Sequence, residues 1–297
     1  MALFLLHNYM DIFKIAIDIG GTYIKSGVID EAQKLHGYQK VKTPENIHNE
    51  ILNEVKNIIE MYVKDFELNN PKVGISTAGV VDSEKGVITY AGPTIPGYNG
   101  TNFKESLAYI THNVEIHNDV SCALLGELSE HDGNTQSLFL MTIGTGIGGA
   151  YYEDKLLEGA NYKACEIGYL LYDEETNTTY EDRASTNALK SIINKQYREP
   201  VSVEQLFELA YSDDEKAMTI LKNWAKKVAE GIAQVQIVFD PEIILIGGGI
   251  SKQEEKLIDL IEPYINQYLP EDYGHARIET TSKGNDSALY GAVALFN

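Results

Sequence analysis

The sequence predicts an α/β fold, because short β-rich runs alternate with stretches whose apolar residues recur at helical spacing. A second observation is that glycine-rich turns directly follow three of the β-rich runs, and two of these turns join a pair of strands. Of the 297 residues, 43% are hydrophobic and 23% are charged, which is typical of a globular protein. These proportions exclude a disordered, collagenous or disulfide-framework protein.

The first part of the chain begins with a glycine hairpin. Phe13–Ile19 and Tyr23–Ile29 are β-rich, and Gly20-Gly21-Thr22 between them is typical of a hairpin turn. The next expected elements are a helix, a strand, a turn-rich stretch, a second strand and a second helix, over residues 46–64, 73–77, 79–100, 114–117 and 121–130. Strand and helix therefore alternate throughout this part.

The second part begins with another strand–glycine–strand unit. Its first strand is Ser137–Thr142, its turn is Gly144–Gly149, and the strand continues through 150–152. A polar, irregular stretch is expected over 173–183. The remaining expected elements are helices over 185–196, 203–211 and 214–238, a strand over 243–246 followed by Gly247–Gly249, and helices over 253–268 and 287–296.

The charge of the chain limits its partners. There are 24 basic and 44 acidic residues, and the formal net charge is −20. A chain this acidic is not expected to bind nucleic acid through a broad phosphate-neutralising face. A polyanion such as ATP can still bind where backbone donors and a metal ion outweigh the overall field.

The cysteines and the start of the chain indicate a cytoplasmic protein. Cys122 and Cys165 are the only cysteines, so a four-cysteine zinc site and a disulfide framework are excluded. No apolar run reaches the length of a membrane span, and no membrane partner is expected. The apolar start lacks a basic segment and stops at His7, so we do not predict a signal peptide. Met10 lies just before the first strand, so residues 1–9 are interpreted as an extension without a role in the fold.

The first glycine turn is a candidate phosphate site. Glycines at a turn can adopt positive φ and expose their amides to a ligand, and a hydroxyl and an ammonium nearby add donors. A carboxylate at the end of the first strand could hold Mg²⁺, directly or through water. The alternative is a plain hairpin. The candidate residues are Asp18, Gly20, Gly21, Thr22 and Lys25.

Two further glycine loops are candidates for nucleotide binding. The turn at 144–149 matches G-x-G-x-x-G, but a strand follows it where the dinucleotide fingerprint needs a helix, so we interpret it as a second phosphate hairpin. Its alternative is a structural turn. The loop at 247–249 follows a strand and precedes a helix, where a nucleoside could lie or where helix and strand could pack closely. The candidate residues are Thr142, Gly144, Thr145, Gly146, Gly148, Gly248 and Gly249.

Six motifs in this order resemble the ROK family (repressors, ORFs and sugar kinases) from about residue 14 to 297. They are Ile17–Thr22, Ile75–Asp82, Asn118-Asp119, Thr142–Gly149, Glu166-Ile167-Gly168 and Gly247–Gly249. The resemblance implies an actin-like ATPase (ribonuclease H-like) fold, in which two α/β domains flank a cleft. It suggests a small domain over 1–118, onto which a helix at about 286–297 packs back, and a large domain over 119–285.

The resemblance also implies the residues of a sugar site. Asp119 is the expected general base, and Asn118 contacts a neighbouring hydroxyl, although this pair could instead cap a helix. Glu166 and Glu181 are expected to accept hydrogen bonds from sugar hydroxyls, and Glu181 could instead be a solvated loop carboxylate. The remaining expected contacts to the sugar come from Gly79 and Tyr169.

Zinc is not expected. Most relatives bind it through three cysteines and the histidine of a Glu-x-Gly-His motif. Here residues 177–181 contain no cysteine, and Tyr169 occupies the histidine position. Tyr169 could donate a hydrogen bond to the sugar or only fill the histidine's space.

Within the family, the chain resembles bacterial N-acetylmannosamine kinases that lack the zinc motif, through 90–96, 168–172 and 184–190. We therefore expect ATP- and Mg²⁺-dependent phosphorylation of N-acetylmannosamine at its 6-hydroxyl, in sialic acid catabolism, by a homodimer formed through the large domain. The main alternative is a kinase for glucose, N-acetylglucosamine or a β-glucoside, because the sequence leaves the preferred epimer open. A sugar-responsive repressor is remote, because too few residues precede Asp18 for a helix-turn-helix module. The intact Asp119 and both glycine hairpins argue against an inactive sugar sensor.

Overall fold

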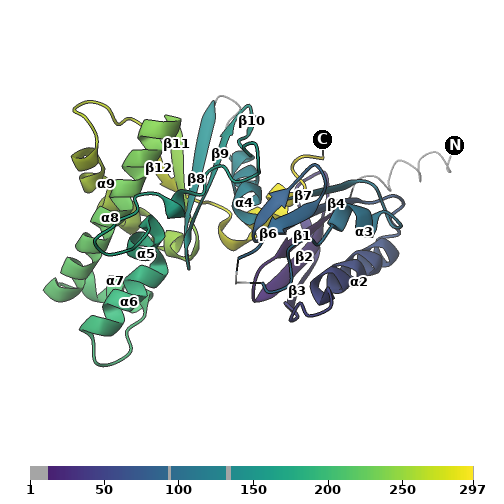
Figure 1. Cartoon of the computed structure of the whole chain (residues 1–297), viewed down its shortest axis with the longest axis horizontal. Helices are drawn as coiled ribbons and strands as arrows, with labels where there is room; N and C mark the ends of the chain where they lie inside the picture. Colours follow the sequence, from purple (N-terminus) through teal and green to yellow (C-terminus); the bar gives the residue numbers. More distant parts are fainter. Residues whose placement is uncertain (1–12, 93–94, 132–134, 297) are drawn as a thin grey trace. The chain divides into compact units, whose positions relative to one another are not determined.

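The computed structural model describes residues 13–92, 95–131 and 135–296, which form two compact α/β units (Figure 1). The first unit runs to Glu130 and also contains Glu158–Lys163 and the residues from Asp286 onward. The second unit contains His131–Leu157 and Ala164–Asn285. The expected extension over residues 1–9 lies outside the described residues, as do Pro93 and Thr94 of the turn-rich stretch.

The first unit contains a five-stranded mixed sheet with the order β3-β2-β1-β4-β7. Its strands are β1 (Lys14–Ile19), β2 (Tyr23–Ile29), β3 (Leu35–Lys42), β4 (Lys72–Thr77) and β7 (Val114–Asn118). β1 and β2 form the expected antiparallel hairpin, and β1, β4 and β7 pair in parallel. A separate two-stranded sheet pairs β5 (Val80–Asp82) with β6 (Val87–Tyr90).

Both faces of the five-stranded sheet are covered, which explains why its central strands are almost continuously apolar. On one face, α2 (Glu50–Asp65) and α3 (Phe103–Leu107) share a core with Ile15, Ile17 and Ile75. On the other face, Leu289 of α10 (Ser287–Ala292) packs with Ala16 of β1.

The approach of α10 to α4 (Asp119–Leu128) is close enough to require glycine. A Cβ on Gly291 would overlap the Cys122 carbonyl of α4, and one on Gly126 would overlap the Ser287 carbonyl of α10. In Figure 1 the yellow C-terminal segment accordingly lies beside the α4 and β7 labels. The sequence places the domain boundary at residues 118/119, whereas this contact carries α4 with the first unit to Glu130.

The second unit repeats the mixed-sheet pattern with the order β10-β9-β8-β11-β12. Its strands are β8 (Ser137–Ile143), β9 (Ile147–Glu153), β10 (Lys155–Leu156), β11 (Ile243–Gly247) and β12 (Arg277–Thr280). Its helices are α5 (Tyr180–Ala184), α6 (Thr186–Gln196), α7 (Val203–Ala210), α8 (Glu215–Phe239) and α9 (Glu255–Ile265). The buried face of α8 centres on Trp224, whose indole N–H donates to the Ala184 carbonyl at 2.9 Å.

The structure departs from the expected elements where the sequence signal is weak. The sequence does not predict β3 or β12, because β3 carries polar residues at an exposed edge and β12 has only four residues. The stretch 173–183, expected to be irregular, contains most of α5. The helix expected over 253–268 is divided into the 3-10 turn η2 (Gly249–Gln253), α9 and the 3-10 turn η3 (Asn266–Tyr268).

The helix contact predicts a measurable loss of stability in Gly291→Ala. The added methyl group overlaps the Cys122 carbonyl, so α10 must move away from α4, and overpacking of this kind costs about 1–3 kcal/mol. Thermal unfolding should show a lower midpoint than in the wild type. Gly249→Ala is the control, because a Cβ there has no neighbour within 4 Å. Equal midpoints for the two variants would show that the close contact is not required.

Candidate active site

The three parallel strands of the first unit end at the same edge of the sheet. Ile19 of β1 lies opposite Thr77 of β4, and Thr77 lies opposite Asn118 of β7. Ligands of α/β sheets bind outside the carboxyl ends of such strands. The expected site residues of this unit lie on these strands or on the segments next to them. They are Asp18, Gly20, Gly21, Thr22, Lys25, Gly79, Asn118 and Asp119.

Asp18 lies in the row of the sheet that also contains Lys25 and Ser76. The Ser76 hydroxyl donates a hydrogen bond to Asp18 Oδ1 at 2.8 Å, and Lys25 Nζ lies 3.4 Å from Oδ2. Burial raises the pKa of the Asp18 carboxyl above its ordinary value, because lost hydration outweighs the lowering effects of Lys25 and Ser76. The charged form of Asp18 is thus disfavoured, and a further cation beside it would stabilise that form.

The turn of the first hairpin does not use left-handed glycines, so the expected positive φ is wrong for both Gly20 and Gly21. The Gly20 N–H donates to the Tyr23 carbonyl at 3.0 Å and closes the turn. Thr43, which follows β3, holds the turn with two hydrogen bonds. Its hydroxyl donates to the Gly20 carbonyl at 2.6 Å, and its N–H donates to the Thr22 carbonyl at 3.0 Å. The hairpin therefore keeps its shape through hydrogen bonds, and its glycines leave the turn without side chains.

Asn118 and Asp119 have different structural tasks. Asn118 is the N-cap of α4, where its Oδ1 accepts the Val120 N–H at 2.9 Å and its Nδ2 donates to the Gly79 carbonyl at 2.9 Å. Asp119 is the first residue of α4, and its Oδ1 also accepts the Val120 N–H, at 3.0 Å. The N-cap position thus belongs to Asn118. The carboxylate of Asp119 lies where the helix N-terminus favours negative charge.

In the second unit, the β8–β9 turn is held by α5 and α6. Glu181 Oε2 accepts the Ile147 N–H at 3.0 Å, and the Thr186 N–H donates to the Gly144 carbonyl at 2.9 Å. A Cβ on Gly146 would overlap the Glu181 carboxylate, so a side chain at this position would displace that carboxylate from its present place. β9 continues directly from the turn, which confirms the rejection of a dinucleotide fingerprint. Of the other candidate residues, Thr142 pairs with Gly148 across the hairpin, and Thr145 lies at its tip.

Glu166 lies on a short segment that packs against β9. It precedes the 3-10 turn η1 (Ile167–Tyr169), and the carbonyl before it, that of Cys165, occupies the space where Gly149 lacks a side chain. A Cβ on Gly168 would lie 2.9 Å from Glu181 Oε2, so the Glu181 carboxylate touches this segment as well as the β8–β9 turn. Tyr169 is 60% exposed. The structure thus assigns Glu181 a structural hydrogen bond that the sequence does not predict.

The loop after β11 contains two glycines with different surroundings, one closely packed and one beside open space. Gly248 has a φ of 88°, and a Cβ on it would come within 2.5 Å of the Ile143 carbonyl oxygen. Gly249 has no neighbour within 4 Å of such an atom. Close packing therefore explains Gly248, whereas Gly249 leaves room beside η2. The expected site residues thus form two sets, one on each unit.

Comparison with known proteins identifies the family of this chain. The profile of the ROK family matches residues 14–297. The chain belongs to the ROK family. An uncharacterized protein of Clostridium perfringens is 37% identical over 93% of this chain and 95% of its own length. The N-acetylmannosamine kinase of Pasteurella multocida is 30% identical over 94% of both chains.

The fold comparison leads to the same family. The crystal structure of a ROK hexokinase from Thermus thermophilus superposes with a TM-score of 0.80 at 25% identity, covering 95% of this chain and 97% of that one. The expected actin-like fold and the expected class, an ATP-dependent sugar kinase of the ROK family, are therefore confirmed.

The sequence does not point to His117, although it directly precedes the Asn118-Asp119 pair. The buried imidazole lies between two carboxylates, with Nδ1 3.3 Å from Glu158 Oε1 and Nε2 3.8 Å from Glu115 Oε2, and neither nitrogen makes a well-formed hydrogen bond. Burial alone would lower the pKa of His117, but the two carboxylates outweigh it and raise that pKa. His117 thereby attaches Glu158, and with it the segment Glu158–Lys163, to the first unit.

Among the residues that the structure describes, no group of three or more His, Cys, Asp or Glu side chains could hold a metal ion. No helix in the described part of the chain is long and apolar enough to cross a bilayer.

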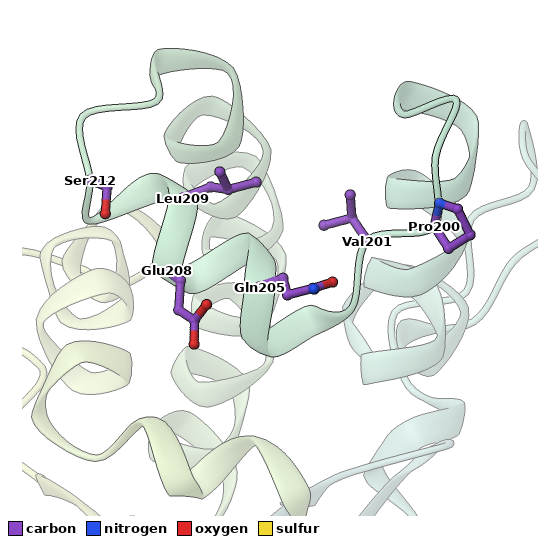
Figure 2. Close-up of a pocket in the computed structure, with 6 residues that line it drawn as sticks. All are labelled: Pro200, Val201, Gln205, Glu208, Leu209 and Ser212. Atoms are coloured by element: carbon purple, nitrogen blue, oxygen red, sulfur yellow. The ribbon is translucent and has the colours of Figure 1, made fainter.

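A surface pocket of about 420 Å³ lies in the second unit, on α7 and the segment before it (Figure 2). None of its lining residues is an expected site residue. It is lined by Pro200, Val201, Gln205, Glu208, Leu209 and Ser212.

The raised pKa of Asp18 predicts that Asp18→Asn is more stable than the wild type at neutral pH. The folded state holds the carboxyl proton more tightly than the unfolded chain, so stability falls as the pH rises from the ordinary aspartate pKa, about 4, through the folded pKa. Thermal midpoints measured against pH should show the largest difference at neutral pH and its disappearance in acid.

Asp65→Asn, at an exposed position of the same unit, is the control for the loss of one charge. If Asp18→Asn is no more stable than the wild type at neutral pH, the carboxylate does not lower stability and the argument from burial is wrong.

Proposed function

We propose that this protein transfers the γ-phosphoryl group of ATP to the 6-hydroxyl of N-acetylmannosamine. The observation that carries the proposal is that Asn118, and not Asp119, caps α4. Asn118 ends strand β7 and occupies the N-cap, and Asp119 follows it as the first residue of α4, at a position that favours a carboxylate. A short, fixed carboxylate there suits a general base for a sugar hydroxyl.

Phosphoryl transfer depends on positioning and charge more than on covalent chemistry. In the proposed reaction, Asp119 accepts the proton of the sugar hydroxyl. Backbone amides near the tips of the two glycine turns donate to the phosphates, other than those of Gly20 and Gly144, which donate to carbonyls within their own turns. Lys25 already lies beside Asp18, and Gly249 borders open space where a nucleoside could lie.

Mg²⁺ would supply positive charge to the β- and γ-phosphates of ATP. Asp18 is the residue that would hold it, directly or through water. The fit rests on the buried setting of this carboxylate, whose charged form a cation stabilises. No zinc ion has a part in the proposal.

The sugar would be held by Gly79, Asn118, Glu166, Tyr169 and Glu181. Asn118 is oriented by its bond to the Gly79 carbonyl, and Glu181 by its bond to the Ile147 N–H. Because one oxygen of Glu181 is used in that bond, its other oxygen is the acceptor proposed for the sugar.

The choice of N-acetylmannosamine rests on the Pasteurella relative and on the resemblance of 168–172 and 184–190 to kinases of that sugar. The alternative is another hexose or a β-glucoside, since relatives at 27% identity are named β-glucoside kinase in Klebsiella pneumoniae and glucokinase in Thermotoga maritima. We further propose a cytoplasmic homodimer that acts in sialic acid catabolism.

The choice of sugar predicts the outcome of an ATP-consumption assay. N-acetylmannosamine should give the highest kcat/KM in a panel with N-acetylglucosamine, glucose, mannose and cellobiose. A higher kcat/KM for any other sugar would reassign the substrate and leave the kinase class intact. Failure of every sugar would contradict the proposed activity.

The base role predicts the behaviour of Asp119→Asn. This nearly isosteric change should leave folding and sugar affinity close to wild type and lower kcat by roughly 10²–10⁴, the usual contribution of a positioned base. Steady-state kinetics and calorimetry measure the two effects separately.

Asn118→Ala is the matched control for the cap. Loss of an N-cap side chain costs about 1 kcal/mol, so this variant should have the lower melting temperature of the two. If Asp119→Asn keeps more than about a tenth of the wild-type kcat, Asp119 is not the base.

A further inference from the structure

A small hairpin follows Glu166 and turns back into α5. The backbones of Asp173 and Thr178 exchange two hydrogen bonds, of 2.8 and 3.2 Å, and the Tyr180 N–H donates to the Leu170 carbonyl at 2.9 Å. Its first arm begins at the proposed sugar contact Tyr169, the last residue of η1, and its second arm leads to Glu181. We call residues 169–180 the sugar hairpin.

Arg183 of α5 binds both arms of the sugar hairpin. Its Nη1 donates to the Thr178 carbonyl at 3.0 Å and to the Thr178 hydroxyl at 2.8 Å. Its Nη2 donates to the Leu171 carbonyl at 2.5 Å. The planar guanidinium thus fixes the distance between the two arms. A single ammonium group cannot bind both arms with the same geometry.

The backbone at Leu171 is strained and requires support from its surroundings. Leu171 has a φ of 52°, in the left-handed region, where a non-glycine residue is disfavoured by roughly 1–2 kcal/mol. Such a conformation persists only where its surroundings enforce it. The hydrogen bond from Arg183 to the carbonyl of this same residue is one such constraint.

The position of Arg183 also connects the sugar hairpin to the phosphate turn of its own unit. α5 is one short helix, and it carries Glu181, whose carboxylate binds the Ile147 N–H and touches Gly168. Its other side is anchored to α8, where the Tyr180 hydroxyl donates to the Val228 carbonyl at 2.9 Å. With that side fixed, Arg183 determines where the hairpin lies relative to Glu181.

We propose that Arg183 is a positioning residue for the sugar, which holds the sugar hairpin and its strained Leu171 so that Tyr169 and Glu181 keep their places. The inference rests on the proposed kinase function. Arg183 touches neither substrate in this proposal and acts only through the two arms of the hairpin.

The test compares Arg183→Ala and Arg183→Lys with the exposed control Arg198→Ala. Arg183→Ala should raise the KM for the sugar about tenfold, equivalent to about 1.4 kcal/mol of binding, while the KM for ATP changes far less. Guanidinium ion at millimolar concentration should restore part of the loss in Arg183→Ala, and Arg183→Lys should lie between that variant and the wild type. An equal change in both KM values, or no rescue by guanidinium, would contradict the proposal.

Hydrogen exchange gives a readout that needs no activity. Amides of residues 169–180 should exchange faster in both Arg183 variants than in the wild type, and Arg198→Ala should leave them unchanged. If the wild type phosphorylates no sugar, the proposed function fails, and unchanged exchange in the Arg183 variants would separately show that Arg183 does not hold the hairpin. If Arg183→Ala does not fold, Arg183→Lys decides by the same two measurements.

Discussion

The parallel register of β1, β4 and β7 is the constraint on which the chemistry of the first unit depends. It places the ends of three strands side by side, so a side chain on one strand meets its partners on the next without a long loop. Asp18 receives its hydrogen bond from Ser76 in this way. Asn118 reaches the Gly79 carbonyl from the neighbouring strand end and caps α4 at the same time. A shift of one residue in this register would turn these side chains to the opposite face.

The second unit holds its β8–β9 turn from helices α5 and α6. The Glu181 side chain accepts the Ile147 N–H, the Thr186 backbone N–H donates to the Gly144 carbonyl, and the glycine at 146 leaves room for the Glu181 carboxylate. The two turns look alike in sequence but are supported differently: Thr43 near the edge of the sheet holds the first, and α5 with the start of α6 holds the second. Glycine-rich turns of similar appearance therefore differ in which distant residues they need.

Much of the fold could be predicted from the sequence, because the apolar periods of the central strands and long helices are strong. The glycine hairpin of β1 and β2 and the strand after Gly149 are both present as expected. The edge strand β3 could not be predicted, since its exposed residues have no apolar alternation. The glycines at 20 and 21 do not adopt the positive φ that such a turn allows, and the hydrogen bond from Thr43 to the turn could not be read from the sequence.

The supporting residues of the site were also beyond the sequence. Ser76, His117 and Arg183 act through partners that are distant in the chain or bound by backbone carbonyls, and such contacts leave no local pattern. Asp119 and Glu166 are candidate site residues only because a family resemblance marks them. The division of tasks between Asn118 and Asp119 required the dihedral angles and hydrogen bonds of the helix start.

The packing of α10 on β1, β4 and α4 has a consequence for synthesis on the ribosome. The first unit takes part of its core from residues after Asp286, which are translated after the whole of the second unit. Its sheet emerges early, yet one face, on which α4 contacts β4 and β7, is not fully covered until those residues are made. The second unit contains no segment from beyond Asn285, so it can complete its own core first. Domains usually fold in the order of translation; here the topology reverses that order, and the half that is made first is finished last.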